Sequence, residues 1–228
     1  FNLFSKSLQK AIGKRGLTTP TSIQEKAIPL ILAGKNCLVV SPPGTGKTEA
    51  AVLPVFEMMI RRGVIDELGV HALYITPLRA LNRDVFRRLA EIGEDLGISV
   101  GIRHGDTLAK VRKMQAEKPP ALLITTPETF QAILPGKRMR EHLRKVKWVI
   151  VDEIHELISD KRGVQLLLGL ERLEEIAETS FQRVGLSATI GDPQTIASLL
   201  VGNGRDCEMV EADAPEKEVD VIIEAPQP

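Results

Sequence analysis

The stretch that decides the fold reads Cys37-Leu-Val-Val40 followed by Ser41-Pro-Pro-Gly-Thr-Gly-Lys-Thr48. Four apolar residues predict a buried strand, and the glycines after them predict a tight turn whose backbone N–H groups can face an anion. A glycine-rich turn that ends in Lys-Thr and opens a helix is typical of a phosphate-binding loop. Its strict pattern begins with glycine where this chain has Ser41, so an ordinary strand–turn–helix with a surface lysine is the alternative. The loop residues that we expect to hold a nucleotide are Pro43, Gly44, Thr45, Gly46, Lys47 and Thr48.

A second strand carries acidic residues at its end. Trp148-Val-Ile-Val151 runs directly into Asp152-Glu-Ile-His155. In this pairing Lys47 would contact the β- and γ-phosphates, while Thr48 and Asp152 would hold Mg²⁺, partly through water. Glu153 would orient or deprotonate the attacking water. A solvated acidic turn is the alternative for the second string, and finding both strings in this order favours ATP hydrolysis with Lys47, Asp152 and Glu153 as its catalytic residues.

Short apolar runs recur along the chain with helical stretches between most of them, which predicts an α/β fold. Because the runs are nearly continuous aliphatic residues, we expect a mostly parallel sheet with helices on both faces. The motifs then fall at the carboxyl ends of strands, where open α/β sheets bind ligands. The expected strands cover residues 38–40, 72–76, 98–103, 122–125, 148–151 and 184–187.

Four helices are predicted from their periodicity and their end signals. Thr21 and Gln24 have the spacing of a capping box at the start of a helix that Gly34 ends. Pro54 is expected to kink or break the helix after the phosphate-binding loop. The helices expected cover 21–33, the stretch after residue 48, 77–96 and 165–177, and in the last of these Leu166, Leu167, Leu168, Leu170 and Leu173 are assigned to the core.

Composition limits the class of protein. The chain has 228 residues, of which 43% are hydrophobic, enough for one substantial domain, and its formal net charge is zero. Nucleic acid would therefore have to bind at a local patch. Cys37 and Cys207 lack metal-ligand spacing, so we expect neither zinc nor a disulfide. No apolar run is long enough to span a bilayer, so we expect no membrane partner and a cytoplasmic location. The chain starts at Phe1 and ends in Ala-Pro-Gln-Pro228, which suggests a fragment of something longer.

Further strings extend the pattern along nearly the whole chain. They are Thr21-Ser-Ile-Gln24, Thr76-Pro-Leu-Arg-Ala-Leu81, His104-Gly-Asp106, Thr125-Thr-Pro-Glu128 and Ser187-Ala-Thr189. With the two ATP motifs, the chain resembles the first RecA-like domain of a superfamily 2 helicase. Two longer stretches, Ser159–Gln165 and Val184–Pro193, resemble the large helicase-related (Lhr) family rather than the DEAD-box proteins.

The resemblance implies a RecA-like nucleotide-hydrolysing domain that uses ATP and Mg²⁺. It implies that Gln24 contacts adenine, although the capping box alone could explain this residue. An aromatic residue stacks on the base in related proteins, and Phe4 is a candidate at an unusual spacing. We expect residues 1–208 to form the ATP-binding domain, with the adenine-contacting region at 1–34. Residues 209–228 are expected to hold the last strand and the start of a linker to a second RecA-like domain.

The resemblance also implies a single-stranded nucleic acid as partner, with DNA favoured over RNA. The residues expected to contact its backbone are Arg79, Gly105, Thr126 and Glu128. Between residues 103 and 147 there are eleven Lys or Arg against four Asp or Glu, which suits either a binding face or a solvated face. Arg79 could equally be a surface residue of a first helical turn, and the Thr126 hydroxyl could cap the next helix.

Three residues are expected to couple the nucleotide site to the second domain. They are His155, Ser187 and Thr189, although a packed histidine and a plain turn are the alternatives. Efficient hydrolysis of this type needs an arginine finger, which related enzymes carry on the second RecA-like domain. We therefore expect this chain alone to hydrolyse ATP poorly. The alternatives to an ATP-dependent helicase are a phosphotransferase or nucleotidase for a small substrate, and a non-catalytic nucleotide-dependent scaffold.

Overall fold

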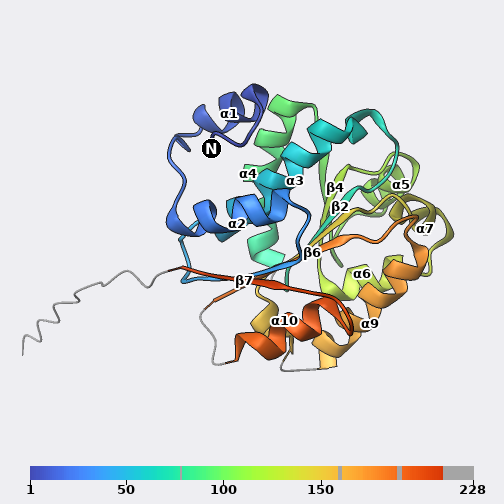
Figure 1. Cartoon of the computed structure of the whole chain (residues 1–228). Helices are drawn as coiled ribbons and strands as arrows, with labels where there is room; N and C mark the ends of the chain where they lie inside the picture. Colours follow the sequence, from blue (N-terminus) through green and yellow to red (C-terminus); the bar gives the residue numbers. More distant parts are fainter. Residues whose placement is uncertain (78, 159–160, 189–191, 213–228) are drawn as a thin grey trace, which may run out of the picture.

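The sheet at the centre of the computed structural model has seven parallel strands. The structure describes residues 1–77, 79–158, 161–188 and 192–212, without the side chains of 79–83 and 158. The strand order is β3-β4-β2-β5-β6-β1-β7. The strands are β1 (Cys37–Val40), β2 (Ala72–Ile75), β3 (Val100–Arg103), β4 (Leu122–Thr125), β5 (Trp148–Val151), β6 (Gln182–Ser187) and β7 (Glu208–Glu211). Strand β7 forms one edge of this sheet (Figure 1). All neighbouring strands pair in parallel, so the predicted α/β fold with a mostly parallel sheet is confirmed.

Helices cover both faces of this sheet. They are α1 (Lys6–Gly13), α2 (Ser22–Leu32), α3 (Lys47–Arg62), α4 (Arg79–Leu96), α5 (Ala109–Glu117), α6 (Pro127–Ile133), α7 (Lys137–Leu143), α8 (Ile154–Ile158), α9 (Lys161–Ile176) and α10 (Pro193–Val201), with a 3₁₀ turn, η1 (Val64–Asp66). Among the described residues, no helix combines the length and apolar composition that crossing a membrane requires.

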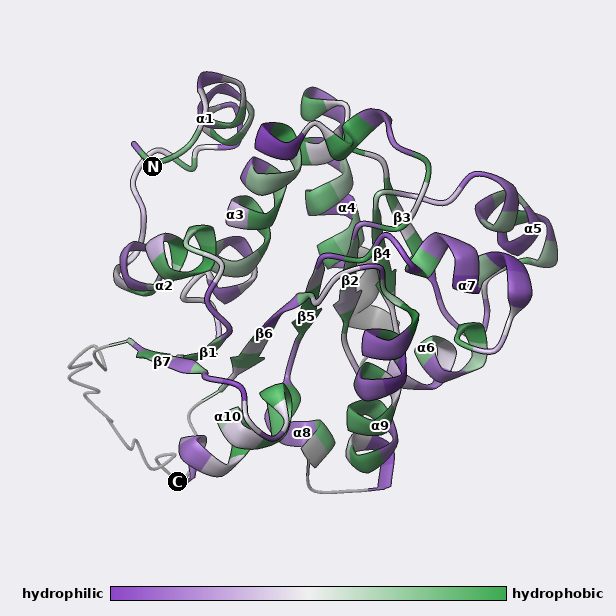
Figure 2. Ribbon diagram, turned by 45° about the vertical axis from the view of Figure 1, so that its right-hand side comes forward, coloured by the Kyte–Doolittle hydropathy of each residue, from purple (hydrophilic) through white to green (hydrophobic). Residues whose placement is uncertain are grey.

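Two hydrophobic cores lie on opposite faces of the sheet. Successive side chains of a strand point to opposite faces, so Cys37 and Val39 join the core under α1 to α4. Leu38 and Val40 join the core under α6 to α10. In Figure 2, α9 alternates between hydrophilic and hydrophobic residues, as expected of a helix with one buried face.

Some predicted details are wrong. The predicted kink or break at Pro54 is not a break, because α3 runs continuously from Lys47 to Arg62 with Pro54 buried inside it. Leu168 is 55% exposed, because helical periodicity turns it away from the face that carries Leu166, Leu170 and Leu173. Helix α9 also begins at Lys161, four residues before the predicted start.

Parallel register brings the carboxyl ends of the strands to one edge. Strand β6 lies between β1 and β5, with Ser187 opposite Val40 and Gly185 opposite Val151. The backbone N–H of Ser41 donates to the carbonyl of Ser187, and that of Asp152 donates to the carbonyl of Ile75. The segments expected to carry the chemistry therefore leave the sheet side by side.

Candidate functional site

A cleft of about 440 Å³ lies at the carboxyl ends of β1 and β5. It is lined by Leu17, Thr19, Thr21, Gln24, residues 43–49, Val85, Arg88, Asp152 and Glu153. A hollow of about 500 Å³ lies at the opposite, amino-terminal edge of the sheet, next to Asn36, Trp148 and Gln182. Open α/β sheets bind ligands at the carboxyl edge, and only the first cleft holds the predicted nucleotide and catalytic residues.

The phosphate-binding loop depends on two glycines with left-handed backbone. The φ angles are 77° at Gly44 and 90° at Gly46, a region that other residues enter only with strain. A Cβ atom on Gly46 would also overlap the side-chain amide of Gln24, whereas one on Gly44 would meet open space. Helix α3 begins directly after this turn, so its unpaired N–H groups and its positive dipole end face the cleft.

Lys47 is held within the loop. Its ammonium donates to the carbonyl of Ser41 at 2.5 Å and to that of Pro42 at 3.2 Å, and the residue is 8% exposed. Burial lowers the pKa of Lys47, while the charges of Glu153 and Asp152 act in the opposite direction. Both acceptors are backbone carbonyls of the loop itself.

Ser41 replaces glycine at the start of the loop without disturbing it. The Ser41 hydroxyl lies 2.7 Å from the Thr45 hydroxyl, which donates to the carbonyl of Pro42 at 2.8 Å. The serine side chain is thus buried and hydrogen-bonded inside the loop. This explains why the departure from the strict pattern is tolerated.

Gln24 links α2 to the loop. Its Oε1 accepts from the backbone N–H of Thr21 at 3.1 Å, as a capping box requires, and its Nε2 donates to the carbonyl of Gly46 at 3.2 Å. The hydroxyl of Thr21 also donates to the carbonyl of Thr45, at 2.9 Å. The capping box therefore explains the contact of Oε1 but not that of Nε2. Contact of Gln24 with adenine stays a prediction.

Asp152 and Glu153 turn into the cleft after β5. Oδ1 of Asp152 accepts from the backbone N–H of Glu153 at 3.0 Å, and Oδ2 accepts from the hydroxyl of Tyr74 at 2.5 Å. Burial raises the pKa of Asp152 to about 6, although the hydrogen bond from Tyr74 and the charge of Lys47 lower it. Glu153 has a φ of 48°, a strained conformation for a residue with a side chain.

Tyr74 is a residue of the site that the sequence patterns missed. It is fully buried on β2, and its hydroxyl also interacts with Thr48, so it joins the two predicted magnesium residues. A signal was present, because this is the only tyrosine of the chain and it lies in a strand expected to be buried. A buried tyrosine hydroxyl needs a polar partner, and Asp152 follows one of the two strands that pair with β2.

The residues in the cleft fit Mg²⁺ bound together with a phosphate. Thr48 and Asp152 offer a hydroxyl and a carboxylate, the oxygen donors that Mg²⁺ prefers, and both line the same cleft. Among the described residues, no cluster of three or more His, Cys, Asp or Glu side chains could hold a metal by itself. A magnesium ion would therefore share its coordination with phosphate oxygens and water.

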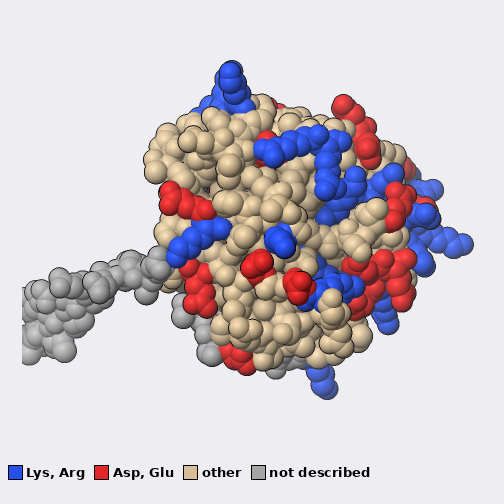
Figure 3. Space-filling view, viewed as in Figure 1, with Lys and Arg blue, Asp and Glu red and all other residues tan. Residues whose placement is uncertain are grey.

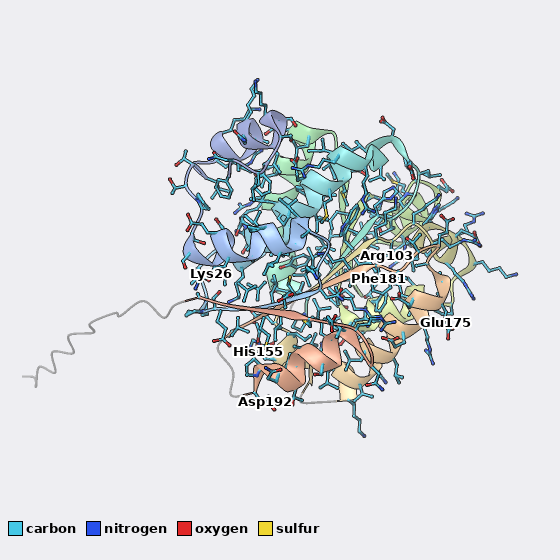
Figure 4. All side chains as sticks on the ribbon, viewed as in Figure 1. Lys26, Arg103, His155, Glu175, Phe181 and Asp192 are labelled. Atoms are coloured by element: carbon cyan, nitrogen blue, oxygen red, sulfur yellow. The ribbon has the colours of Figure 1, made fainter. Side chains whose placement is uncertain are left out.

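Among the predicted coupling residues, His155 lies between Glu153 and Ser187. Nδ1 of His155 is 3.1 Å from the hydroxyl of Ser187, 3.4 Å from the backbone N of Ala188 and 3.5 Å from Oε2 of Glu153. One imidazole thus touches the end of β6 and the predicted catalytic glutamate. Thr189 lies outside the described residues. Figure 4 labels His155.

Phe4 does not line the cleft. Its ring is buried in the core and stacks on Phe1 with centroids 5.7 Å apart. The apolar residues that do line the cleft are Leu17 and Val85, and no aromatic residue of the described chain is among its lining.

A second hollow, of about 350 Å³, brings together three of the predicted nucleic-acid contacts. Gly105, Thr126 and Glu128 all line it. The Thr126 hydroxyl accepts from the backbone N–H of Thr129 at 3.4 Å, so it caps α6 as the alternative proposed. Glu128 pairs with Arg162 at 2.6 Å. Arg79 begins α4, and its side chain lies outside the described part of the structure.

The fold and the cleft define a RecA-like nucleotide-binding domain. The family model "DEAD/DEAH box helicase" matches residues 21–196, which is most of the chain. The chain belongs to the DEAD/DEAH box helicase family.

Within this family the similarity is to Lhr-type helicases, as predicted. The chain is 46% identical to "ATP-dependent helicase Lhr-Core" of Sulfolobus acidocaldarius, covering 84% of this chain and 23% of the relative. It is 41% identical to the protein of the same name from Methanocaldococcus jannaschii, covering 93% of this chain and 26% of the relative. The chain therefore spans about a quarter of the length of these curated relatives.

A solved structure shows the same fold. The helicase Lhr of Mycobacterium smegmatis, bound to ssDNA and AMP-PNP, matches with a TM-score of 0.84 and 36% identity over 92% of this chain and 28% of that chain. The predicted resemblance to a RecA-like domain of an Lhr-type helicase is thus confirmed.

Proposed function

We propose that this chain is the ATP-binding and ATP-hydrolysing motor domain of a nucleic-acid helicase or translocase of Lhr type. The observation that carries the proposal is that Lys47, Thr48, Asp152 and Glu153, more than a hundred residues apart in two groups, line one cleft beside Gln24. A scaffold that only binds nucleotide has no need of this complete set.

Each residue has a distinct role in this proposal. The triphosphate lies on the loop at the N-terminus of α3, and Lys47 exchanges its loop carbonyls for phosphate oxygens. Gln24 contacts adenine through the amide that bonds to Gly46. Glu153 orients the attacking water and takes its proton. Thr48 and Asp152 would hold magnesium, which would supply positive charge to the phosphates.

The partners follow from the same family membership. We propose that the hollow with Gly105, Thr126 and Glu128, together with Arg79, binds the backbone of single-stranded nucleic acid, with DNA favoured over RNA. Residues 1–208 would form the motor domain, and 209–228 its last strand and the start of a linker to a second RecA-like domain that supplies an arginine finger. A domain that uses ATP on DNA would work in the cytoplasm.

The test is ATP turnover by this chain and by a longer protein that contains the second domain, each with and without single-stranded DNA and RNA. We expect stimulation by nucleic acid in the longer protein only, and the better activator identifies the strand. Glu153→Gln should remove turnover while leaving ATP binding within about twofold. Turnover that ignores nucleic acid but phosphorylates a small molecule would overturn the proposal in favour of a phosphotransferase.

A further inference from the structure

Two arginine side chains in the second hollow have buried N–H groups without a hydrogen-bond partner. Arg103 ends β3 and carries an unpartnered Nη1, and Arg112 of α5 carries an unpartnered Nε. Both residues line the hollow with Gly105, Thr126 and Glu128. Burial lowers the pKa of Arg103, and the positive charge of Arg112 lowers it further, so the two guanidinium groups influence each other directly. Arg103 is labelled in Figure 4.

The arrangement is unfavourable for a protein that holds it without a ligand. Arg103 and Arg112 are partly buried, and one guanidinium nitrogen of each is shielded from solvent. A shielded N–H group without an acceptor costs free energy, and two like charges close together repel. Among the described residues, no ion pair joins either arginine to an acidic group. The nearby acids have other partners, since Glu128 pairs with Arg162 and Asp106 lies 3.8 Å from His104.

Arg15 and Arg183 also have a buried Nε without a hydrogen-bond partner, but each of them is paired with a carboxylate. The half-buried or exposed groups of Arg15, Arg61 and Arg88 each pair with a carboxylate, at 2.7, 2.7 and 2.5 Å. The fully buried Arg183 pairs with two carboxylates. Among the described arginines with an unpartnered buried N–H group, Arg103 and Arg112 are therefore the two without an ion pair.

The hollow is also built to hold the two side chains in place. A second guanidinium nitrogen of Arg112 donates to the carbonyl of Gly105, which fixes its direction. The side chain of Gln115 donates to the carbonyl of Ile102 at 3.0 Å and so fastens α5 to the end of β3. Arg103 of β3 and Arg112 of α5 thus belong to two elements joined by a hydrogen bond at Ile102, the residue before Arg103.

We propose that Arg103 and Arg112 form a phosphate site for the backbone of the nucleic-acid strand. A phosphodiester offers two charged oxygens to the forked donors of guanidinium, and it would satisfy the buried N–H groups while cancelling the repulsion. The inference rests on the proposed function, because three predicted strand contacts line the same hollow. Figure 3 shows Lys and Arg side chains gathering on the right of the view, where Figure 1 places α5 and α7.

The test measures binding of a fluorescent single-stranded oligonucleotide as a function of potassium chloride. Arg103→Gln and Arg112→Gln should each lower affinity at least about fivefold at low salt and reduce the log–log salt slope by about 0.7, the value for one single-strand phosphate contact. Arg140→Gln is the matched control, because this exposed arginine of α7 lies outside the hollow and makes the same charge change. The two substitutions should lower the affinity for an oligonucleotide of abasic sites by the same factor as for a normal one, because the proposed contact is to phosphate and not to a base.

A purely structural role of the two arginines predicts the opposite thermal result. Since a repelling, unpaired cation is removed, Arg103→Gln should keep or raise the melting temperature of the free protein, whereas loss of a structural contact would lower it. Inorganic phosphate at constant ionic strength should raise the melting temperature of the unsubstituted chain only slightly, because a free phosphate makes none of the neighbouring contacts of a nucleic-acid strand.

The outcomes separate the two proposals. If the unsubstituted chain and the longer protein both fail to bind the oligonucleotide, the proposed function falls and this inference falls with it. If they bind, but Arg103→Gln and Arg112→Gln match Arg140→Gln in affinity and salt slope, the phosphate site is overturned and the proposed function stands.

Discussion

The hydroxyl of Tyr74 on β2 donates a 2.5 Å hydrogen bond to Oδ2 of Asp152 at the end of β5. The two strands are direct neighbours in register, with Tyr74 opposite Ile150. Oδ1 of the same carboxylate accepts from the backbone of Glu153. Both oxygens of the predicted magnesium ligand are therefore oriented by the domain before a nucleotide arrives.

Replacement of Tyr74 by phenylalanine should separate this orienting role from packing. The ring is kept, so we expect the free energy of unfolding to fall by only about 1 kcal/mol, the typical value of one hydrogen bond. The magnesium concentration that half-saturates ATP turnover in the longer protein should rise at least about fivefold, because Asp152 is no longer held. Turnover with an unchanged magnesium requirement would contradict the role.

Asp152 should make the nucleotide-free protein less stable at neutral pH. Burial raises its pKa from 3.8 to about 6, so the folded protein holds a proton that the unfolded chain has released. The protonated carboxyl makes its full contribution to the free energy of unfolding below pH 3.8. This contribution declines as the pH rises toward about 6 and is lost above that. Asp152→Asn should therefore unfold at a higher temperature than the parent at pH 7.5, with a free energy of unfolding larger by up to about 3 kcal/mol, while losing ATP turnover.

The same comparison at lower pH is the control for Asp152→Asn. The difference in melting temperature between the two proteins should shrink steadily from pH 7 to pH 4, measured without nucleotide or magnesium. A difference that is constant with pH would show that the carboxylate is not protonated on folding.

The contact between Gln24 and Gly46 makes the loop sensitive to a single methyl group. Gly46→Ala should abolish binding of a fluorescent ATP analogue, because the new Cβ overlaps the Gln24 amide and the φ of 90° disfavours alanine. Gly44→Ala is the matched control, since it has a similar φ of 77° but open space around the added methyl. We expect its affinity loss to be at least about tenfold smaller.

A double substitution tests whether the overlap is the cause. Adding Gln24→Ala to Gly46→Ala removes the overlapping amide, so part of the lost binding should return, while Gln24→Ala alone weakens binding. Losses that simply add would show that backbone strain, and not Gln24, explains the effect of Gly46→Ala.

His155 is placed to transmit events at Glu153 to the end of β6. Removing it in His155→Ala breaks the contacts with Ser187 and Ala188. We expect affinity for ATP to change less than twofold, and stimulation of ATP turnover by single-stranded DNA in the longer protein to fall at least about tenfold. A loss of ATP affinity of the same size would assign the residue to the nucleotide site itself.

Much of the fold could be predicted from the sequence because its signals are local. The apolar runs of β1, β2, β4, β5 and β6 precede loops whose glycine, threonine and acidic residues have known preferences. A parallel sheet then forces these ends to one edge. By contrast, the edge strand β7 has one buried residue in four, so its weak apolar signal gives only an approximate position, from residue 209 onward, for a strand that covers Glu208–Glu211.

The parts of the site that escaped prediction depend on contacts between distant segments. Tyr74 looks like any residue of a buried strand until β2 is placed beside β5. The unpaired state of Arg103 can be seen only when its surroundings are known, because the sequence shows merely a basic stretch. The cap at Thr126 has no unique sequence signal, because a hydroxyl before proline suits both a helix start and a ligand contact.

Strand β7 also fixes where the described part of the chain leaves the sheet. Because β7 runs parallel to β1, Glu211 and Ala212 emerge at the same edge as the nucleotide cleft, where Lys26 bonds to the carbonyl of Glu211 and Ala212 bonds to that of Val40. In the proposed two-domain protein, a second domain connected on this side would lie near the nucleotide cleft, and its covalent connection would give it an effective concentration there of about millimolar. Closure of such a domain over ATP would then need only a weak interface, which is easily opened again after each turnover.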